Sequence, residues 1–258
     1  MTQGQHAVKG CSSKDWMMNK TTLAITLVVV SASALAEDAT APVGNAELGF
    51  SNTTGNSEVT TVKGKVEYKH WLSKFENRYL LEALYVEDDQ QVSKERYYAE
   101  AQSNYRFGEH AYLFGFASND IDKFSGYHYV ATAAAGVGRR LYQGNKIHLD
   151  GEIGPGYSYK RVDPVQAPGE PNESSIIARA NLDFWWAFSD NAEFRQKLAS
   201  DVSLSGNATI TKAESSVTAS LVGSLAMKFA FSVKHTTKPV DAKESLDTET
   251  SMTLLYKF

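Results

Sequence analysis

The sequence predicts an all-β fold, a transmembrane antiparallel up-and-down β-barrel of about 12 strands. Three observations predict it: an export signal precedes the main body of the chain, polar and apolar residues alternate in long segments, and long connections alternate with short ones. Strands of soluble sheets are mostly about 5–6 residues long, whereas a tilted strand that crosses a bilayer needs roughly 9–11 residues. The segment lengths therefore favour strands that span a membrane.

A secretory signal peptide is predicted near the N-terminus. Met18–Lys20 is a short basic region, Leu23–Val30 is an apolar run, and Ala34–Ala36 is the small-x-small pattern that precedes a cleavage site. The apolar run is too short for a membrane-spanning helix, which needs roughly 20 residues. We therefore interpret residues 1–17 as an upstream extension, 18–36 as the signal peptide, cleaved between Ala36 and Glu37, and 37–258 as the barrel.

Composition and charge exclude several classes of protein. The chain has 26 basic and 30 acidic residues, and removal of residues 1–36 takes away three lysines and one aspartate. The exported chain is thus mildly acidic, and nothing in it favours binding to nucleic acid. The one cysteine, Cys11, precedes the apolar run. Neither a disulfide scaffold nor a lipid anchor on the exported chain is therefore expected.

Alternation runs through the segments in chain order. Around Val62–Tyr68, lysines and a glutamate separate the apolar positions, and within Arg96–Arg106 the even positions are polar or charged. Ile147–Tyr159 carries its apolar residues at odd positions, and Ile176–Phe188 carries them at even positions. Each segment thus has one apolar face and one polar face. We expect the apolar face to contact lipid and the polar face to line the lumen.

Eleven connections separate the predicted strands, and long ones alternate with short ones. An even number of strands places both ends of the barrel-forming chain on the periplasmic side, where turns are short. The connections are, in order, Asn52–Ser57, Leu72–Lys74, Asp88–Ser93, Gly108–Glu109, Asn119–Gly126, Gln143–Asn145, Asp163–Glu173, Asp190–Asn191, Gly206–Thr211, Val222–Ser224 and Pro239–Leu246.

Aromatic residues are predicted to form two belts where the barrel wall meets the lipid headgroups. The alternative is that aromatic residues are simply favoured in strands. The predicted periplasmic belt consists of Trp71, Tyr105, Phe107, Tyr142, Trp186, Phe188 and Phe258. The predicted outer belt consists of Tyr97, Tyr127, Tyr129, Tyr157 and Tyr159.

The last segment, Ser251–Phe258, alternates up to its final residue. Met252, Leu254, Tyr256 and Phe258 are predicted to face outward. The strand is expected to pair with the first one, because an unpaired strand edge is not tolerated in lipid. A terminal aromatic residue after alternating apolar residues also resembles the signal by which the outer-membrane assembly machinery recognises its substrates, with Tyr256 and Phe258 at its key positions.

Charged residues of both signs are predicted to face the lumen. Opposite charges on neighbouring strands can pair or line water, whereas unpaired charges in a narrow lumen are costly. The set therefore forms either a polar pathway for small solutes or a network that plugs the lumen, since wide channels belong to barrels of roughly 16–18 strands. The predicted network consists of Arg96, Glu100, Arg106, Asp150, Glu152, Arg179, Asp183 and Arg195, with Lys63, Lys65, Glu67, Lys197 and Asp201 on the same face.

Motifs for catalysis, cofactors and metals are weak. Gly136–Gly138 is not followed by a helix pattern, so its glycines are interpreted as relieving crowding or permitting a bend in the wall, not as a nucleotide loop. Ser125 near His128, and His148 beside Asp150, leave a lipid hydrolase open as an alternative. Nucleophilic catalysis needs a serine and an oriented base, and no such pair is evident. We expect no cofactor and no metal.

Several short stretches occur in a recognisable order: Leu48–Ser57, Asp122–Tyr127, Gly136–Gly138, Gly151–Tyr157, and Asp247–Thr250 leading to Leu255–Phe258. Together they resemble the salt-induced outer-membrane protein family, also called YdiY-like, whose domain has no assigned function. The resemblance covers essentially all of residues 37–258. Where relatives often place an arginine, this chain has Tyr157 and Ser158.

The residues and the resemblance together indicate a monomeric, non-enzymatic barrel of the outer membrane of a Gram-negative bacterium. A narrow channel or a role in envelope integrity is expected, and osmotic stress enters through the resemblance alone. Expected partners are outer-membrane lipid and lipopolysaccharide, the barrel assembly machinery and periplasmic chaperones. The acidic groups Glu87–Asp89 and Asp120 with Asp122 are predicted to lie in outer loops, as solvated tips or as collectors of divalent cations. A lipid-modifying hydrolase and an exported soluble β-sheet binding protein are the alternatives.

Overall fold

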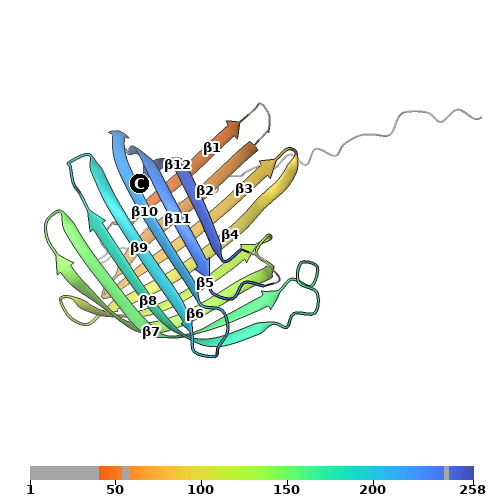
Figure 1. The fold of residues 1–258 in the computed structure, drawn as a ribbon. Coiled ribbons are helices and arrows are strands. Elements are labelled where there is room, and N and C mark those ends of the chain that lie inside the picture. The colour runs from red at the N-terminus through yellow and green to blue at the C-terminus, as the bar shows by residue number, and fades with distance from the viewer. Residues whose placement is uncertain (1–40, 54–58, 241–243) are drawn as a thin grey trace, which may run out of the picture. The chain divides into compact units, whose positions relative to one another are not determined.

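The computed structural model describes residues 41–53, 59–240 and 244–258. These residues form twelve strands in a closed antiparallel barrel in which β12 pairs with β1 (Figure 1). The predicted fold class is therefore confirmed. The predicted signal peptide and its cleavage between Ala36 and Glu37 lie outside the described residues. The strands are β1 (Val43–Thr53), β2 (Val59–Leu72), β3 (Phe75–Asp88), β4 (Gln91–Arg106), β5 (Ala111–Asp122), β6 (Tyr127–Gln143), β7 (Ile147–Val162), β8 (Glu173–Trp186), β9 (Ala192–Ser203), β10 (Ile210–Val222), β11 (Leu225–Thr236) and β12 (Leu246–Lys257).

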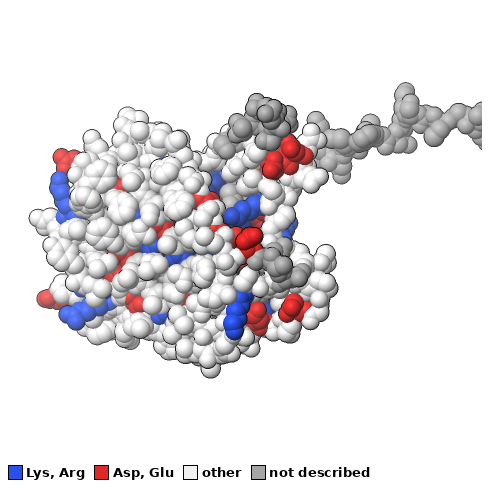
Figure 2. All heavy atoms as spheres, in the orientation of Figure 1, with Lys and Arg blue, Asp and Glu red and all other residues white. Residues whose placement is uncertain are grey.

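Side chains alternate between two environments along the strands. Lys63 and Lys65 on the inner face of β2 are each 7% exposed, whereas Leu81 on β3 is 62% exposed and Met252 on β12 is 61% exposed. A soluble sheet protein would instead bury its apolar residues and expose its charges. The barrel has an apolar outside and a charged inside. In the space-filling view, uncharged residues cover most of the visible face, and the charged ones show mainly in narrow bands and at its borders (Figure 2).

Connections differ between the two ends of the barrel, although less regularly than predicted. We call the end where β1 begins and β12 finishes the turn end, and the opposite end the loop end. The loop-end connections include residues 163–172 and 237–245. The predicted loop Asp88–Ser93 is wrong, because β3 and β4 continue to a two-residue turn at Asp89 and Gln90, with φ of 45° and 63°. Two residues in the left-handed region match the twist of a tight hairpin.

Two aromatic residues predicted for the lipid-facing belts lie on the inner face instead. Trp71 lies near the turn end as predicted, yet its Nε1 donates a hydrogen bond to Glu76 Oε2 at 3.3 Å. Tyr127 is buried at the loop end and contacts Val162 and Ala167. The register between β6 and β7 shifts between Tyr127 and Tyr129. Because of this irregularity, the two tyrosines lie on opposite faces although they are two positions apart. The other belt residues lie on the outward face.

A small apolar cluster covers part of the loop end. Tyr127 from β6 and Val162 from β7 pack with Ala167, from the β7–β8 loop, and Val240, from the β11–β12 loop. Beneath them Lys160 is only 2% exposed, and its Nζ donates to the carbonyl oxygen of Ala208 at 2.9 Å. The cluster thus joins two loop-end connections, and Lys160 links the β9–β10 connection to β7.

The backbones of β6 and β7 approach each other closely at Gly136 and Gly154. A Cβ atom added to Gly136 would occupy the place of the Ile153 carbonyl oxygen, and one added to Gly154 would occupy that of the Ala135 carbonyl oxygen. Pro155 has no N–H to donate, and the pairing of the two strands is interrupted beside it. The glycines therefore allow close approach of two backbones, in agreement with their interpretation as relieving crowding in the wall.

No helix among the described residues is long and apolar enough to cross a membrane.

Candidate functional site

The lumen of the barrel is the candidate site, because it gathers buried charges from every side of the wall. A polar cavity of about 240 Å³ lies toward its loop end and opens to solvent. Its lining includes nine basic and nine acidic side chains. The basic ones are Lys63, Lys65, Arg78, Lys94, Arg96, Arg179, Lys197, Lys212 and Lys234, and the acidic ones are Glu82, Glu100, Asp120, Asp122, Asp183, Asp201, Glu214, Asp247 and Glu249.

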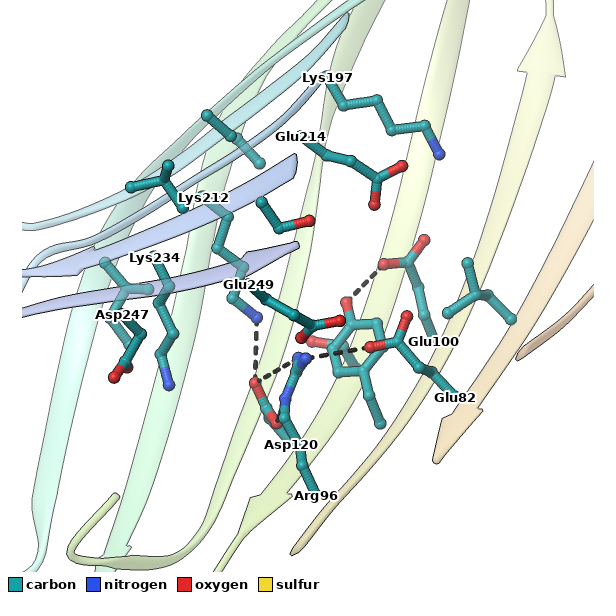
Figure 3. A pocket seen from close by; sticks show the side chains of 18 of the residues that line it. Glu82, Arg96, Glu100, Asp120, Lys197, Lys212, Glu214, Lys234, Asp247 and Glu249 are labelled. Atoms are coloured by element: carbon teal, nitrogen blue, oxygen red, sulfur yellow. Dashed lines mark hydrogen bonds and ion pairs between the residues drawn. The ribbon is translucent and has the colours of Figure 1, made fainter. Parts of the chain in front are cut away.

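Asp120 is the centre of the network in this cavity (Figure 3). Arg96 donates to both of its carboxylate oxygens, at 2.7 and 3.1 Å, and Lys212 Nζ lies 3.1 Å from Oδ2. Arg96 also donates to Glu82 at 3.1 Å. The prediction that Asp120 lies in a loop is wrong, because β5 continues to Asp122. The side chain of Asp120 points into the lumen and is only 8% exposed.

The contact between Asp120 and Lys212 crosses the lumen. Asp120 lies on β5 and Lys212 on β10, which are five strands apart one way around the ring and seven the other. Both cations also approach the ring of Tyr98, at 5.3 Å for Arg96 Cζ and 4.9 Å for Lys212 Nζ. A second crossing contact joins Lys65 on β2 to Glu214 on β10, at 3.8 Å. The two crossing contacts narrow the lumen between opposite walls.

Aromatic side chains fill the lumen on the side of β5. Phe114 and Phe116 point inward and are 3% and 5% exposed. The guanidinium carbon of Arg179 lies 3.6 Å above the centre of the Phe116 ring, and Arg179 Nη1 donates to Asp201 at 2.7 Å. A guanidinium stacked on a ring keeps its donors free in the ring plane. Arg179 therefore joins an apolar filling to the charged network.

A mid-height layer is connected through Glu152. Its carboxylate accepts hydrogen bonds from Gln102 at 2.7 Å, from the Tyr112 hydroxyl at 2.9 Å and from Asn181 at 3.2 Å. These partners come from β4, β5 and β8. Because several strands contribute to one carboxylate, this layer is a packed network and not a water-lined wall.

The predicted lumen residues all lie on the inner face, and most of them pair locally. Glu100 accepts from Arg78 at 2.5 Å, and Arg195 donates to both oxygens of Asp183, the longer bond being 2.8 Å. At the turn end Asp150 pairs with Arg140 at 2.7 Å. Arg106 pairs with Glu76 there, apart from the cavity. The two pairs that cross the lumen use three residues absent from the predicted network: Asp120, Lys212 and Glu214.

The residues considered for a hydrolase are not assembled. The imidazole of His148 stacks on Trp185 with ring centres 4.9 Å apart, and Ser125 Oγ donates to the Asp122 carbonyl oxygen at 2.8 Å. No hydrogen bond joins a serine to a histidine within residues 41–53, 59–240 and 244–258. Gly136 and Gly138 lie inside the barrel wall, where they pair with β5 and β7.

Comparison with known families identifies the chain. A family model described as "Protein of unknown function, DUF481" matches residues 46–258. The chain belongs to this DUF481 family. It is also 29% identical, over 166 residues, to the "Uncharacterized protein YdiY" of Escherichia coli strain K12, covering 64% of this chain and 62% of the relative. The chain thus matches less than two thirds of that relative's length, and the predicted YdiY-like resemblance is confirmed.

A solved outer-membrane channel shares the barrel fold at low identity. The COG4313 outer membrane channel from Pseudomonas putida F1 has a TM-score of 0.50 and 12% identity, over 87% of this chain and 97% of that one. The translocator domain of the autotransporter NalP from Neisseria meningitidis has a TM-score of 0.47 and 12% identity, over 84% of this chain and 87% of that one. The first likeness concerns the fold alone.

Proposed function

We propose that this DUF481 protein is an integral β-barrel of the Gram-negative outer membrane, without a catalytic role, whose lumen is closed by ion pairs. In this proposal the turn end faces the periplasm and the charged cavity opens to the cell exterior. The barrel contributes to the integrity of the envelope, and the resemblance to salt-induced proteins extends this role to osmotic stress. The protein works as a monomer. Periplasmic chaperones deliver it to the assembly machinery, which recognises Tyr256 and Phe258.

The distribution of apolar residues supports the membrane location. Ile153, Leu81 and Met252 are all more than half exposed on the outer face. Burying such residues in hydrocarbon is favourable, at about 25 cal/mol per Å² of apolar surface. Carbonate or urea washing of cell membranes tests the location, because only an integral barrel stays with the membrane. Release of the protein into the wash would identify it as an exported soluble protein.

The crossing contacts carry the proposal of a closed lumen. Asp120 with Lys212 and Lys65 with Glu214 join opposite walls, and the carboxylate of Asp120 is buried beneath its two cations. An open pore of a large porin instead leaves an aqueous channel between its walls. Removal of a crossing pair should therefore admit water and ions where the charged side chains now meet.

Conductance across planar bilayers tests this proposal. We expect the refolded protein to give no current above the lipid background, and the double variant Asp120→Ala with Lys212→Ala to give measurable current. The matched control is Lys146→Ala with Asp190→Ala, which removes an exposed pair at the turn end and should leave the bilayer silent. A steady current through the unmodified protein would contradict the closed lumen and would establish a narrow channel instead.

The absence of a catalytic role has its own test. We expect no product when the refolded protein is incubated with phospholipid and lipid A, with and without calcium. A released fatty acid would contradict this part of the proposal. Ser125→Ala would then decide whether Ser125 is the nucleophile.

A further inference from the structure

The barrel closes along one short seam. β1 and β12 pair through four residue pairs, from Asn45 with Lys257 to Leu48 with Leu254, and Gly44 and Phe258 exchange two further backbone hydrogen bonds. By contrast, β2 and β3 pair through 14 residue pairs over their full length. Gly49 still lies against Met252 and Thr253 of β12. From Phe50 to Thr53, β1 pairs with β2 and no longer with β12. The two strands diverge from the turn end toward the loop end (Figure 1).

Charged side chains occupy the inner side of this gap. Lys63 on β2 reaches past β1 to Glu249 on β12, with 2.5 Å between Nζ and Oε1, and its Nζ lies 3.4 Å from Ser251 Oγ. Lys63 and Glu249 also line the loop-end cavity. The space-filling view is hollowed at the loop end, with charged residues at the border of the hollow (Figure 2).

Apolar side chains flank the same gap on the outside. Phe50 on β1 is 69% exposed and Met252 on β12 is 61% exposed. Both are the residues that would face each other if the regular pairing continued beyond Leu48 and Leu254. The gap therefore has apolar side chains on its outer side and charged side chains on its lumen side.

We infer that the loop-end half of the β1–β12 seam is a lateral opening that admits the zwitterionic head group of a phospholipid into the cavity, while its acyl chains stay outside the barrel. This inference rests on the proposed membrane location. The equal number of basic and acidic residues in the cavity lining suits a head group that carries one charge of each sign. Lys63 and Glu249 form the latch of the opening, and they are also the first ionic groups that an entering head group meets.

Unpaired backbone supports an opening used by polar groups. Backbone N–H and C=O groups without partners cost several kcal/mol each in hydrocarbon. A seam left unpaired in the membrane is therefore expensive unless water or lipid head groups reach it. Its position at the loop end, next to the charged cavity, provides such access.

A single-cysteine reporter tests the opening directly. In a Cys11→Ser background, Ser251→Cys places a thiol behind the seam and keeps the Lys63–Glu249 pair. The matched control is Ser118→Cys, which lines the same cavity on β5. Each protein is refolded into phosphatidylcholine vesicles that contain phosphatidylethanolamine with a maleimide on its head group, or is treated with a soluble maleimide.

We expect the soluble maleimide to modify both cysteines and the lipid maleimide to modify only Ser251→Cys. Adding Lys63→Met, which removes the latch, should raise the rate of lipid modification several-fold, and Lys63→Arg should leave it unchanged. Equal modification of both cysteines by the lipid reagent, or none of Ser251→Cys, would overturn the inference.

Disulfide formation provides a second measurement that does not depend on a lipid. Oxidation should cross-link Leu48→Cys with Leu254→Cys, which are paired, but not Phe50→Cys with Met252→Cys. Equally fast cross-linking of both pairs would mean a closed seam. These outcomes are independent of bilayer current, so a conducting lumen would contradict the proposed function and leave the lateral opening intact. A protein that fails to insert into vesicles would instead contradict the membrane location.

Discussion

The β6–β7 side of the barrel and the β1–β12 seam close the same wall by different means. At β6–β7, glycine backbones approach so closely that a single methyl group would not fit. The inward rings of Phe114 and Tyr112 on β5 lie beside them, and the Tyr112 ring covers Gly138. At the seam, a short backbone ladder connects β1 and β12, and the ion pair between Lys63 and Glu249 links β2 to β12.

The difference shows that close packing holds one part of the barrel wall together and that charge pairing holds another part. Close packing has one arrangement and resists opening, because any separation loses contacts on both sides. An ion pair tolerates exchange, since water or another charged group can replace either partner. The seam is therefore the side on which the barrel can open.

The largest expected effect is on the close-packed side. Gly154→Ala should destabilise the folded barrel by about 3 kcal/mol, the upper end for overpacking, because its methyl group would overlap the Ala135 carbonyl oxygen. The measurement is the folded fraction in a urea titration, read from the mobility of unboiled samples on a gel. Gly115→Ala is the control, since no atom lies within 4 Å of its added Cβ. Equal stability of the two variants would contradict the difference between the two sides.

An intermediate effect is expected at the seam. Lys63→Met should cost about 2 kcal/mol in the same titration, because it leaves Glu249 without its charged partner. The double variant Lys63→Met with Glu249→Met should recover part of this loss, since no charge is then left unpaired. A double variant less stable than the sum of the two single ones would mean that the pair is not the connection that matters.

The smallest effect is expected for an exposed ion pair near the close-packed side. Lys146 and Asp190 join two turns at 2.8 Å, and the hydrogen bond from Lys146 lowers the pKa of the Asp190 carboxyl. A lowered pKa contributes stability above the unfolded-state pKa and loses it as the pH falls through the folded-state value. Because both groups are exposed, Lys146→Ala should leave the urea midpoint unchanged within error at neutral pH. A clear shift would show that exposed charges stabilise this barrel as much as the seam pair does.

Much of the fold could be predicted because lipid imposes a simple rule on each strand. Alternation in β7 and β8 identified the outward residues, and an even strand number followed from the turns. The turn at Asp89 and Gln90 was missed because polar residues there resemble a longer loop, whereas the left-handed backbone of the turn is set by the twist of the hairpin.

The site was less predictable because alternation shows that a strand has two faces but does not show which face points into the lumen. In β5 the inward residues include Phe114 and Phe116, and the outward ones include Gly115 and Ala117. Large apolar residues thus face the lumen and small ones face outward, the reverse of the usual order. The neighbouring glycines of β6 make room for these rings inside the barrel. Which charges cross the lumen, as Asp120 and Lys212 do, depends on strands far apart in the sequence, and one sequence contains no signal for that distance.

The cluster of Tyr127, Val162, Ala167 and Val240 has a consequence for whatever meets the protein from its loop end. Two connections that pack against each other present a fixed surface, whereas unattached loops would present a fluctuating one. A protein that binds this end would therefore lose little loop entropy on binding, and a substitution that loosens the cluster would weaken binding without changing the contact surface.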